Sequence, residues 1–210
     1  MSRALARFDR PRKKTVVAAE RDEQARQDWQ AVAETLPARR VTVIDESGTH
    51  LDMLSRYARA PRGKRAVATQ RRNTGKNMTL LAGITLEGMT APLVIEGGVT
   101  TAVLDAYFGE VLCPTLHPGD IVILDNLSAH HAPSVTQILL DHGCRVFFLP
   151  AYSPDFSPIE NAFAKIKNVL RRLRAQTLDA LLDAIAEALQ AITPADAIGY
   201  FTNAGLLNLD

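Results

Sequence analysis

The order of apolar and polar residues changes near residue 40. From there on, short apolar runs rich in β-branched residues alternate with turn residues, a pattern typical of strands. Strands are predicted over residues 41–44, 78–86, 91–96, 121–124 and 145–149. Apolar residues at helical spacing predict helices over residues 99–112, 133–141, 158–174 and 178–192. Residues 55–72 give weaker strand signals around a predicted turn at residues 61–63.

This order of elements predicts an α/β fold, a mixed sheet with helices packed on its faces. Strands first follow one another and then alternate with helices, which gives antiparallel neighbours followed by parallel crossovers. Residues 41–210 are therefore expected to form one globular domain. Residues 1–40 are predicted to be a basic N-terminal appendage or linker with one helix, from about residue 18 to Leu36, ended by Pro37. This segment has too few predicted helices for a complete helix-turn-helix module.

Three carboxylates stand at the ends of predicted buried elements. Asp45 follows the apolar run 41–44, and Asp125 follows the run 121–124. Glu160 lies at the start of a predicted helix, with 34 residues between it and Asp125. A carboxylate next to a buried strand is costly to desolvate unless it is paired or binds a cation. Three of them together suit divalent metal ions held over a phosphodiester.

Each of these acids also has a structural alternative. Asp125 could cap the turn that follows it. Glu160 fits a capping box with Ser157 as the N-cap residue. However, Glu160 lies on a stripe of the predicted helix that continues with basic residues at helical spacing, namely Lys167, Arg171 and Arg174. A capping glutamate does not need that basic row, whereas a metal-binding carboxylate beside DNA would benefit from it.

Neighbouring polar residues compete for the same roles. Glu46 follows Asp45, and consecutive strand residues point to opposite faces, so only one of the two is expected to face a site. Asp45 is the preferred candidate because it directly follows the apolar run. Asp155 shares the motif of Glu160 and is its rival. His130 and His131 follow Asp125 closely, and His130 is a possible accessory contact to a phosphate or metal, although a loop histidine often only forms structural hydrogen bonds.

Composition narrows the function classes. The 210 residues are 47% hydrophobic and 22% charged, as in a globular protein. The sequence has no apolar segment of membrane-spanning length and no secretory signal, so no membrane association and a cytoplasmic location are expected. Cys113 and Cys144 lack metal-ligand spacing and are predicted to be core residues. Glycine-rich phosphate loops and nucleophile elbows are also missing.

The distribution of charge is more informative than the net charge of +1. Nineteen of the 24 Lys and Arg residues lie in the tracts 1–14, 56–76 and 165–174. Such clustering is typical of a nucleic-acid-binding surface, although each tract alone could be a solvated face. The residues predicted to contact DNA phosphates are Arg71, Arg72, Lys167, Arg171 and Arg174.

Taken together, these motifs resemble the catalytic domain of a DDE transposase of the mariner superfamily, in its bacterial insertion-sequence branch. The matching segments are residues 44–47, residues 124–126 with His130, and residues 150–161, which read Pro-Ala-Tyr-Ser-Pro-Asp-Phe-Ser-Pro-Ile-Glu-Asn. The resemblance extends from residue 41 to about residue 205. One departure is Ser157, where the family usually has Asn; both residues are good N-caps.

The resemblance implies an RNase H-like fold with Asp45, Asp125 and Glu160 as a catalytic triad that binds two Mg²⁺ or Mn²⁺ ions. It also implies DNA strand cleavage and strand transfer in transposition, with transposon ends and target DNA as partners, and a homodimer. Family members usually have helix-turn-helix domains ahead of this domain. The missing module suggests a partner encoded by an upstream frame, or a truncated remnant. The alternatives are a nuclease that cuts without joining and a non-catalytic, DNA-binding or regulatory remnant.

Overall fold

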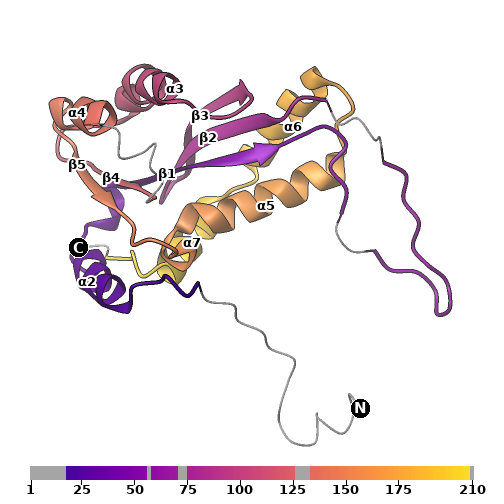
Figure 1. The fold of residues 1–210 in the computed structure, drawn as a ribbon, viewed down its shortest axis with the longest axis horizontal. Helices are drawn as coiled ribbons and strands as arrows, with labels where there is room; N and C mark the ends of the chain where they lie inside the picture. Colours follow the sequence, from indigo (N-terminus) through magenta and orange to yellow (C-terminus); the bar gives the residue numbers. More distant parts are fainter. Residues whose placement is uncertain (1–17, 56–57, 71–74, 126–132, 209–210) are drawn as a thin grey trace, which may run out of the picture.

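The fold is built on one five-stranded sheet, described here from a computed structural model (Figure 1). The structure describes residues 18–55, 58–70, 75–125 and 133–208. The strands are β1 (Val41–Thr49), β2 (Met78–Thr85), β3 (Gly88–Glu96), β4 (Ile121–Leu124) and β5 (Arg145–Phe148). Their order in the sheet is β3-β2-β1-β4-β5. Strands β3, β2 and β1 are antiparallel neighbours, while β1, β4 and β5 run parallel. The predicted mixed sheet is confirmed.

Helices cover both faces of the sheet (Figure 1). One face carries α5 (Pro158–Leu173), α6 (Leu178–Gln190) and α7 (Pro194–Asn203), together with α2 (Glu23–Ala33). The other face carries α3 (Thr101–Ala106), its π-helical continuation η2 (Tyr107–Leu112), and α4 (Pro133–Asp141). Two separate apolar clusters fill the layers on either side of the sheet. Buried apolar side chains alternate between these clusters, as expected for strands covered on both faces.

Short 3-10 turns connect several of these elements. They are η1 (Ala38–Arg40), η3 (Cys113–Thr115) and η4 (Pro154–Phe156). Cys113 and Cys144 are buried and are not joined in a disulfide, which confirms their expected place in the core. None of the helices in the described ranges is both long and apolar enough to cross a membrane.

The N-terminal helix differs from the expectation of a separate appendage. Trp29 and Leu36 are almost fully buried in the same apolar cluster as α5. The Trp29 ring also makes an edge-to-face contact with Phe147 of β5, with 6.4 Å between ring centroids. Residues 23–40 therefore pack against the sheet domain and contribute side chains to its core. The basic residues 1–17 lie outside the described residues.

Three further elements differ from the prediction. Strand β1 continues to Thr49, so Asp45 lies within the strand instead of at its end. Helix α7 was not predicted, although Thr193 and Asp196 form a capping box around Pro194 that is visible in the sequence. Among the described residues of the segment 55–72 there is no strand; the expected turn exists, with a hydrogen bond from Lys64 N–H to the Pro61 carbonyl.

Candidate active site

The two strand aspartates reach the same face of the sheet because of strand alternation. Val41 and Val43 of β1 face the cluster that contains α5, as do Ile121 and Ile123 of β4. Asp45 continues the odd-numbered positions of β1, and Asp125 continues those of β4. The parallel register pairs Ile44 with Leu124, so the two acids occupy equivalent positions on adjacent strands.

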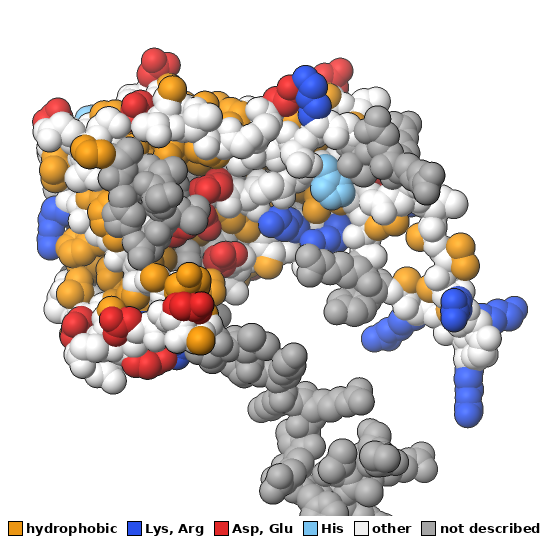
Figure 2. Space-filling model, viewed as in Figure 1, with side chains coloured by type: hydrophobic (Ala, Val, Ile, Leu, Met, Phe, Trp, Pro, Cys, Tyr) orange, Lys and Arg blue, Asp and Glu red, His pale blue; other side chains and the backbone are white. Residues whose placement is uncertain are grey.

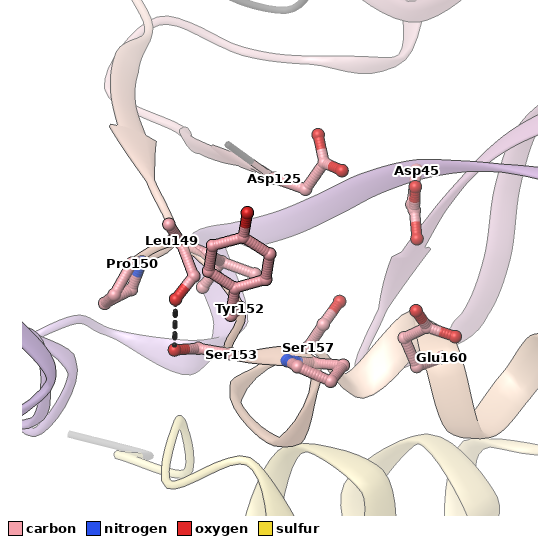
Figure 3. A pocket seen from close by; sticks show the side chains of 10 residues that line it. Asp45, Asp125, Leu149, Pro150, Tyr152, Ser153, Ser157 and Glu160 are labelled. Carbon is pink, nitrogen blue, oxygen red and sulfur yellow. Dashed lines mark hydrogen bonds between the residues drawn. The ribbon is translucent and has the colours of Figure 1, made fainter. Parts of the chain in front are cut away.

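Glu160 comes from the helix that crosses this face. It lies in the first turn of α5, which begins at Pro158. Ser157 is the N-cap residue, but its side chain makes no capping hydrogen bond, so the predicted capping box is not formed. The glutamate side chain is exposed and borders a pocket of about 440 Å³ that Asp45 and Asp125 also line. Figure 3 shows the three carboxylates around one hollow.

The electrostatics of this pocket are unusual for a surface site. Asp45 is 9% exposed and accepts a hydrogen bond from Glu46 N–H at 2.7 Å. Burial raises the pKa of the Asp45 carboxyl to about 7, with further increases from the charges of Asp125, Glu46 and Glu160, against the lowering effect of that hydrogen bond. The negative charges of Asp125 and Glu160 therefore act on Asp45 across the pocket, an arrangement that disfavours the ionised form of Asp45 unless a cation is near.

The donor set fits hard divalent cations. All three candidate ligands are carboxylates, which Mg²⁺ and Mn²⁺ prefer. The described residues that line the pocket include three acids and no lysine or arginine. No cluster of three or more His, Cys, Asp or Glu side chains among the described residues stands close enough to hold one ion together. Pairs of these carboxylates, completed by water, suit the usual coordination of Mg²⁺.

The rival acids have other positions. Asp155 is drawn away from the pocket by Arg26, which it contacts with both carboxylate oxygens at 3.0 and 2.6 Å. It lines a different pocket with α2. Glu46 does not line the acidic pocket, whereas Asp45 does. The structure thus brings together the three acids preferred from the sequence.

Two of the predicted DNA-contacting residues lie near this pocket. Lys167 and Arg171 follow Glu160 along one side of α5 and line a hollow of about 500 Å³ with His50 and Gln70. In Figure 2, acidic side chains lie along the hollowed middle of the molecule, and basic side chains follow beside them. Positive charge beside an acidic pocket is the arrangement that a DNA backbone near metal ions requires.

Arg174 has a different set of contacts. It ends α5 in a left-handed conformation and donates to Asp52 at 2.7 Å and to the Thr69 carbonyl at 2.9 Å. These contacts bind it to the two ends of the segment between β1 and β2, so we leave Arg174 out of the proposed DNA surface. Arg71, Arg72 and His130 lie outside the described residues.

Sequence reasoning did not assign a site role to Tyr152. Its side chain is 58% exposed, it lines the acidic pocket, and its φ is +56°. Positive φ is rare for a bulky residue and often marks functional positions. Figure 3 shows its ring beside the carboxylates. The only signal in the sequence is the position of Tyr152 between Pro150 and Ser153, which does not reveal the backbone conformation.

The fold is shared with solved transposase structures. The strand order and flanking helices match the RNase H-like crystal structure of the catalytic domain of Mos1 mariner transposase, with a TM-score of 0.67 and 16% identity over 91% of this chain and 93% of that one. The Mos1 strand transfer complex gives a TM-score of 0.75 and 20% identity over 97% of this chain. The chain spans 65% of that longer protein. The Mos1 paired-end complex with Mg has a TM-score of 0.72 at 20% identity, over 97% of this chain and 67% of that chain. No curated protein sequence matches the chain.

The fold and the three acids therefore define an RNase H-like protein of the DDE type. Residues 40–182 match the family described as DDE superfamily endonuclease. The chain belongs to that family.

Proposed function

We propose that this chain is the catalytic domain of an insertion-sequence transposase, which cleaves DNA strands and transfers the freed 3′ ends to a target. The observation that carries the proposal is the meeting of Asp45, Asp125 and Glu160, from β1, the end of β4 and α5, at one pocket. Similar structures support it, since Mos1 forms a strand transfer complex and a paired-end complex with a transposon end.

In this proposal, Asp45, Asp125 and Glu160 hold two Mg²⁺ or Mn²⁺ ions. Metal ions in such sites activate the attacking oxygen and stabilise the leaving oxygen of an in-line displacement. The rigid sheet fixes the two aspartates, and α5 brings Glu160 to them. Mos1 structures with Mn and with Mg support this choice of ions.

The proposal includes the partners of such an enzyme. Lys167 and Arg171 are proposed to contact DNA phosphates, which contribute affinity but little sequence information. From the sequence alone, Arg71 and Arg72 are also proposed to contact DNA phosphates. His130 is proposed to lie near the scissile phosphate. Transposon ends and target DNA are the proposed substrates, a homodimer is the proposed assembly, and a helix-turn-helix protein from an upstream frame is a proposed partner. The proposed location is the cytoplasm.

The decisive variant is Asp125→Asn, which keeps the shape of the side chain and removes its charge. We expect it to lower Mn²⁺-dependent nicking of supercoiled DNA by at least about 100-fold, a loss of roughly 3 kcal/mol of transition-state stabilisation. Non-specific DNA binding and the thermal unfolding midpoint should stay close to wild type. The measurement is the initial nicking rate of the full chain with and without Mn²⁺.

Asp141→Asn is the matched control, because Asp141 lies in α4 on the other face of the sheet and accepts a hydrogen bond from Gln137, an exposed residue of the same helix. Equal nicking by Asp125→Asn and wild type would refute the site. Metal-dependent nicking without joining, on DNA that carries the element's own ends, would favour a nuclease. No cleavage by wild type under any of these conditions would favour the non-catalytic remnant.

A further inference from the structure

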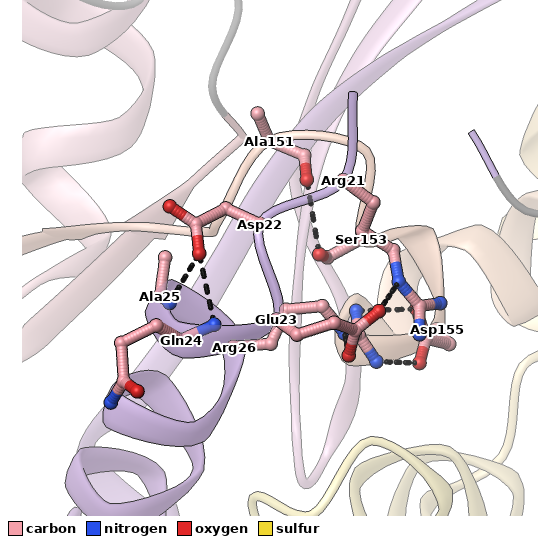
Figure 4. Close-up of polar contacts among 9 residues, drawn as sticks. All are labelled: Arg21, Asp22, Glu23, Gln24, Ala25, Arg26, Ala151, Ser153 and Asp155. Carbon is pink, nitrogen blue, oxygen red and sulfur yellow. Dashed lines mark hydrogen bonds and ion pairs between the residues drawn. The ribbon is translucent and has the colours of Figure 1, made fainter. Parts of the chain in front are cut away.

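Arg26 of α2 contacts residues that are far from it in the sequence. Its guanidinium donates to both carboxylate oxygens of Asp155, at 3.0 and 2.6 Å (Figure 4). It also lies 4.0 Å from the centroid of the Phe156 ring. Arg26 is 8% exposed, which is unusual for an arginine. A bidentate ion pair and an aromatic stack fix both the direction and the plane of the guanidinium.

The residues that Arg26 contacts, Asp155 and Phe156, belong to a loop whose other residues line the acidic pocket. Within residues 151–157, Ser153, Pro154 and Ser157 line the acidic pocket, while Asp155 and Phe156 line the neighbouring pocket beside α2. This short loop therefore separates the two pockets, and Arg26 contacts the loop from the side of α2. The loop leads directly into α5, whose first turn carries Glu160.

The loop has few means of holding its own shape. Tyr152 has a φ of +56°, and Ser153 has φ −122° and ψ 55°, outside the regions of regular structure. Within residues 151–157, all of which the structure describes, the internal hydrogen bonds are those of a single 3-10 turn and one from the Ser153 hydroxyl to the Ala151 carbonyl at 3.2 Å. Strained backbone persists only where its surroundings fix it. Arg26 supplies such a constraint from outside the segment that matches the endonuclease family, residues 40–182.

We infer that Arg26 is a positioning residue, which holds the loop 151–157 and thereby sets the place of Glu160 relative to Asp45 and Asp125. This inference rests on the proposed function, because it assigns Arg26 a part in that same site. Arg26 does not line the acidic pocket, so it acts through Asp155 and Phe156 and not on the reacting atoms. Helix α2, through Arg26, would thus control whether the three acids are correctly placed to bind metal ions.

The test uses four single variants of the full chain and one double variant. Arg26→Met keeps much of the side-chain length and removes both contacts, Arg26→Lys keeps the charge but not the planar fork, and Asp155→Asn removes the acceptor charge. The matched control is Asp196→Asn. It breaks a comparable pair, Lys165 to Asp196 at 2.7 Å, which joins α5 to α7 away from the loop.

The first measurement is binding of Mn²⁺ alone, without DNA, by the electron paramagnetic resonance signal of the free ion. We expect Arg26→Met to weaken Mn²⁺ binding about 10-fold, as for other residues that orient metal ligands. Asp155→Asn should change it in the same direction, Arg26→Lys should give an intermediate value, and Asp196→Asn should match wild type. Amide hydrogen exchange at Phe156 and Ser157 should become faster in Arg26→Met and in Asp155→Asn, but not in the other two single variants.

The second measurement is steady-state cleavage. Arg26→Met should lower kcat by about 10- to 100-fold, since small displacements of catalytic groups have large effects on rate. KM for DNA should stay within about 2-fold, because the contacts to DNA phosphates are untouched. The double variant Arg26→Met with Asp155→Asn should be no worse than Arg26→Met, because both changes remove one interaction.

Several outcomes would overturn the inference. One is a wild-type Mn²⁺ affinity and kcat in Arg26→Met, even if its unfolding midpoint falls as much as that of Asp196→Asn. Another, if Arg26→Met fails to fold, is a wild-type affinity in both Arg26→Lys and Asp155→Asn. A wild-type chain that binds Mn²⁺ but does not cleave would refute the proposed function, while the Mn²⁺ and exchange comparisons would still decide the role of Arg26.

Discussion

At the scale of single residues, the surroundings of each acid separate its role from that of its neighbours. Asp45 and Asp155 are both aspartates in motif segments, yet Asp45 is buried among acids and Asp155 is paired with Arg26. The Arg26 guanidinium holds the pKa of the Asp155 carboxyl below its usual range, whereas burial raises that of Asp45. Opposite environments thus make one acid a candidate cation ligand and the other a structural anchor.

Tyr152 offers a prediction at this scale. An exposed aromatic ring beside a pocket for a phosphodiester can stack on a nucleobase, which is worth about 1–3 kcal/mol per base. We expect Tyr152→Ala to raise the Kd for single-stranded DNA about 10-fold, while Tyr152→Phe stays close to wild type. Fluorescence anisotropy with a labelled oligonucleotide is the measurement. Equal affinities for all three proteins would show that the ring does not contact DNA.

At the scale of elements, the base of the segment between β1 and β2 is closed by a buried acid. Asp52 is 2% exposed and accepts hydrogen bonds from Arg174 at 2.7 Å and Gln176 at 2.9 Å. Arg174 and Gln70 also donate to carbonyls of this segment, at Thr69 and Asp52. The end of α5 therefore joins both ends of a segment whose described residues extend away from the body of the molecule (Figure 1).

This cluster predicts an effect on stability. Asp52→Asn should lower the free energy of unfolding by about 1–3 kcal/mol, since it leaves a buried position with a weaker acceptor for a charged donor. Asp28→Asn is the matched control, because Asp28 is an exposed acid of α2. Urea denaturation gives the comparison. The same free energy of unfolding for Asp52→Asn and wild type would mean that the cluster contributes nothing to stability.

At the scale of the whole molecule, ion pairs join elements that are distant in the sequence. Arg26 connects α2 to the loop before α5, and Lys165 connects α5 to α7. Hydrogen bonds from Lys165 and Thr193 hold the pKa of the Asp196 carboxyl well below its usual range. An acid with a lowered pKa stabilises the folded chain above its unfolded pKa, and this contribution is lost as the pH falls through the folded pKa.

The pH dependence of unfolding should follow from this sign. The difference in free energy of unfolding between wild type and Asp196→Asn should be full at pH 7. It should begin to shrink near the unfolded pKa of about 4 and vanish at lower pH. Thermal unfolding from pH 7 to pH 2 is the measurement. A difference that is independent of pH would mean that the ionised carboxylate is not the stabilising form.

The sequence alone predicted most elements and singled out the three acids as candidates. Short apolar runs predicted β2 and β4, and apolar residues at helical spacing predicted α4 and α5, because burial on a sheet or helix face constrains such positions locally. The spacing of Asp125 and Glu160 and the surrounding motif indicated the family. Local patterns could not show that β1 continues past Asp45, because a carboxylate inside a strand is tolerated only when its surroundings provide a pocket.

Only the tertiary structure decided which side chains meet. Arg26 and Asp155 are 129 residues apart, and no local signal predicts their ion pair. The same holds for Arg174, which reads as part of a basic stripe but binds Asp52, 122 residues away. Burial patterns depend on near neighbours along the chain, whereas long-range contacts depend on how sheet and helices pack. The sequence therefore singled out the three acids, and the packing of α2 and α5 on the sheet decided which side chains lie around them.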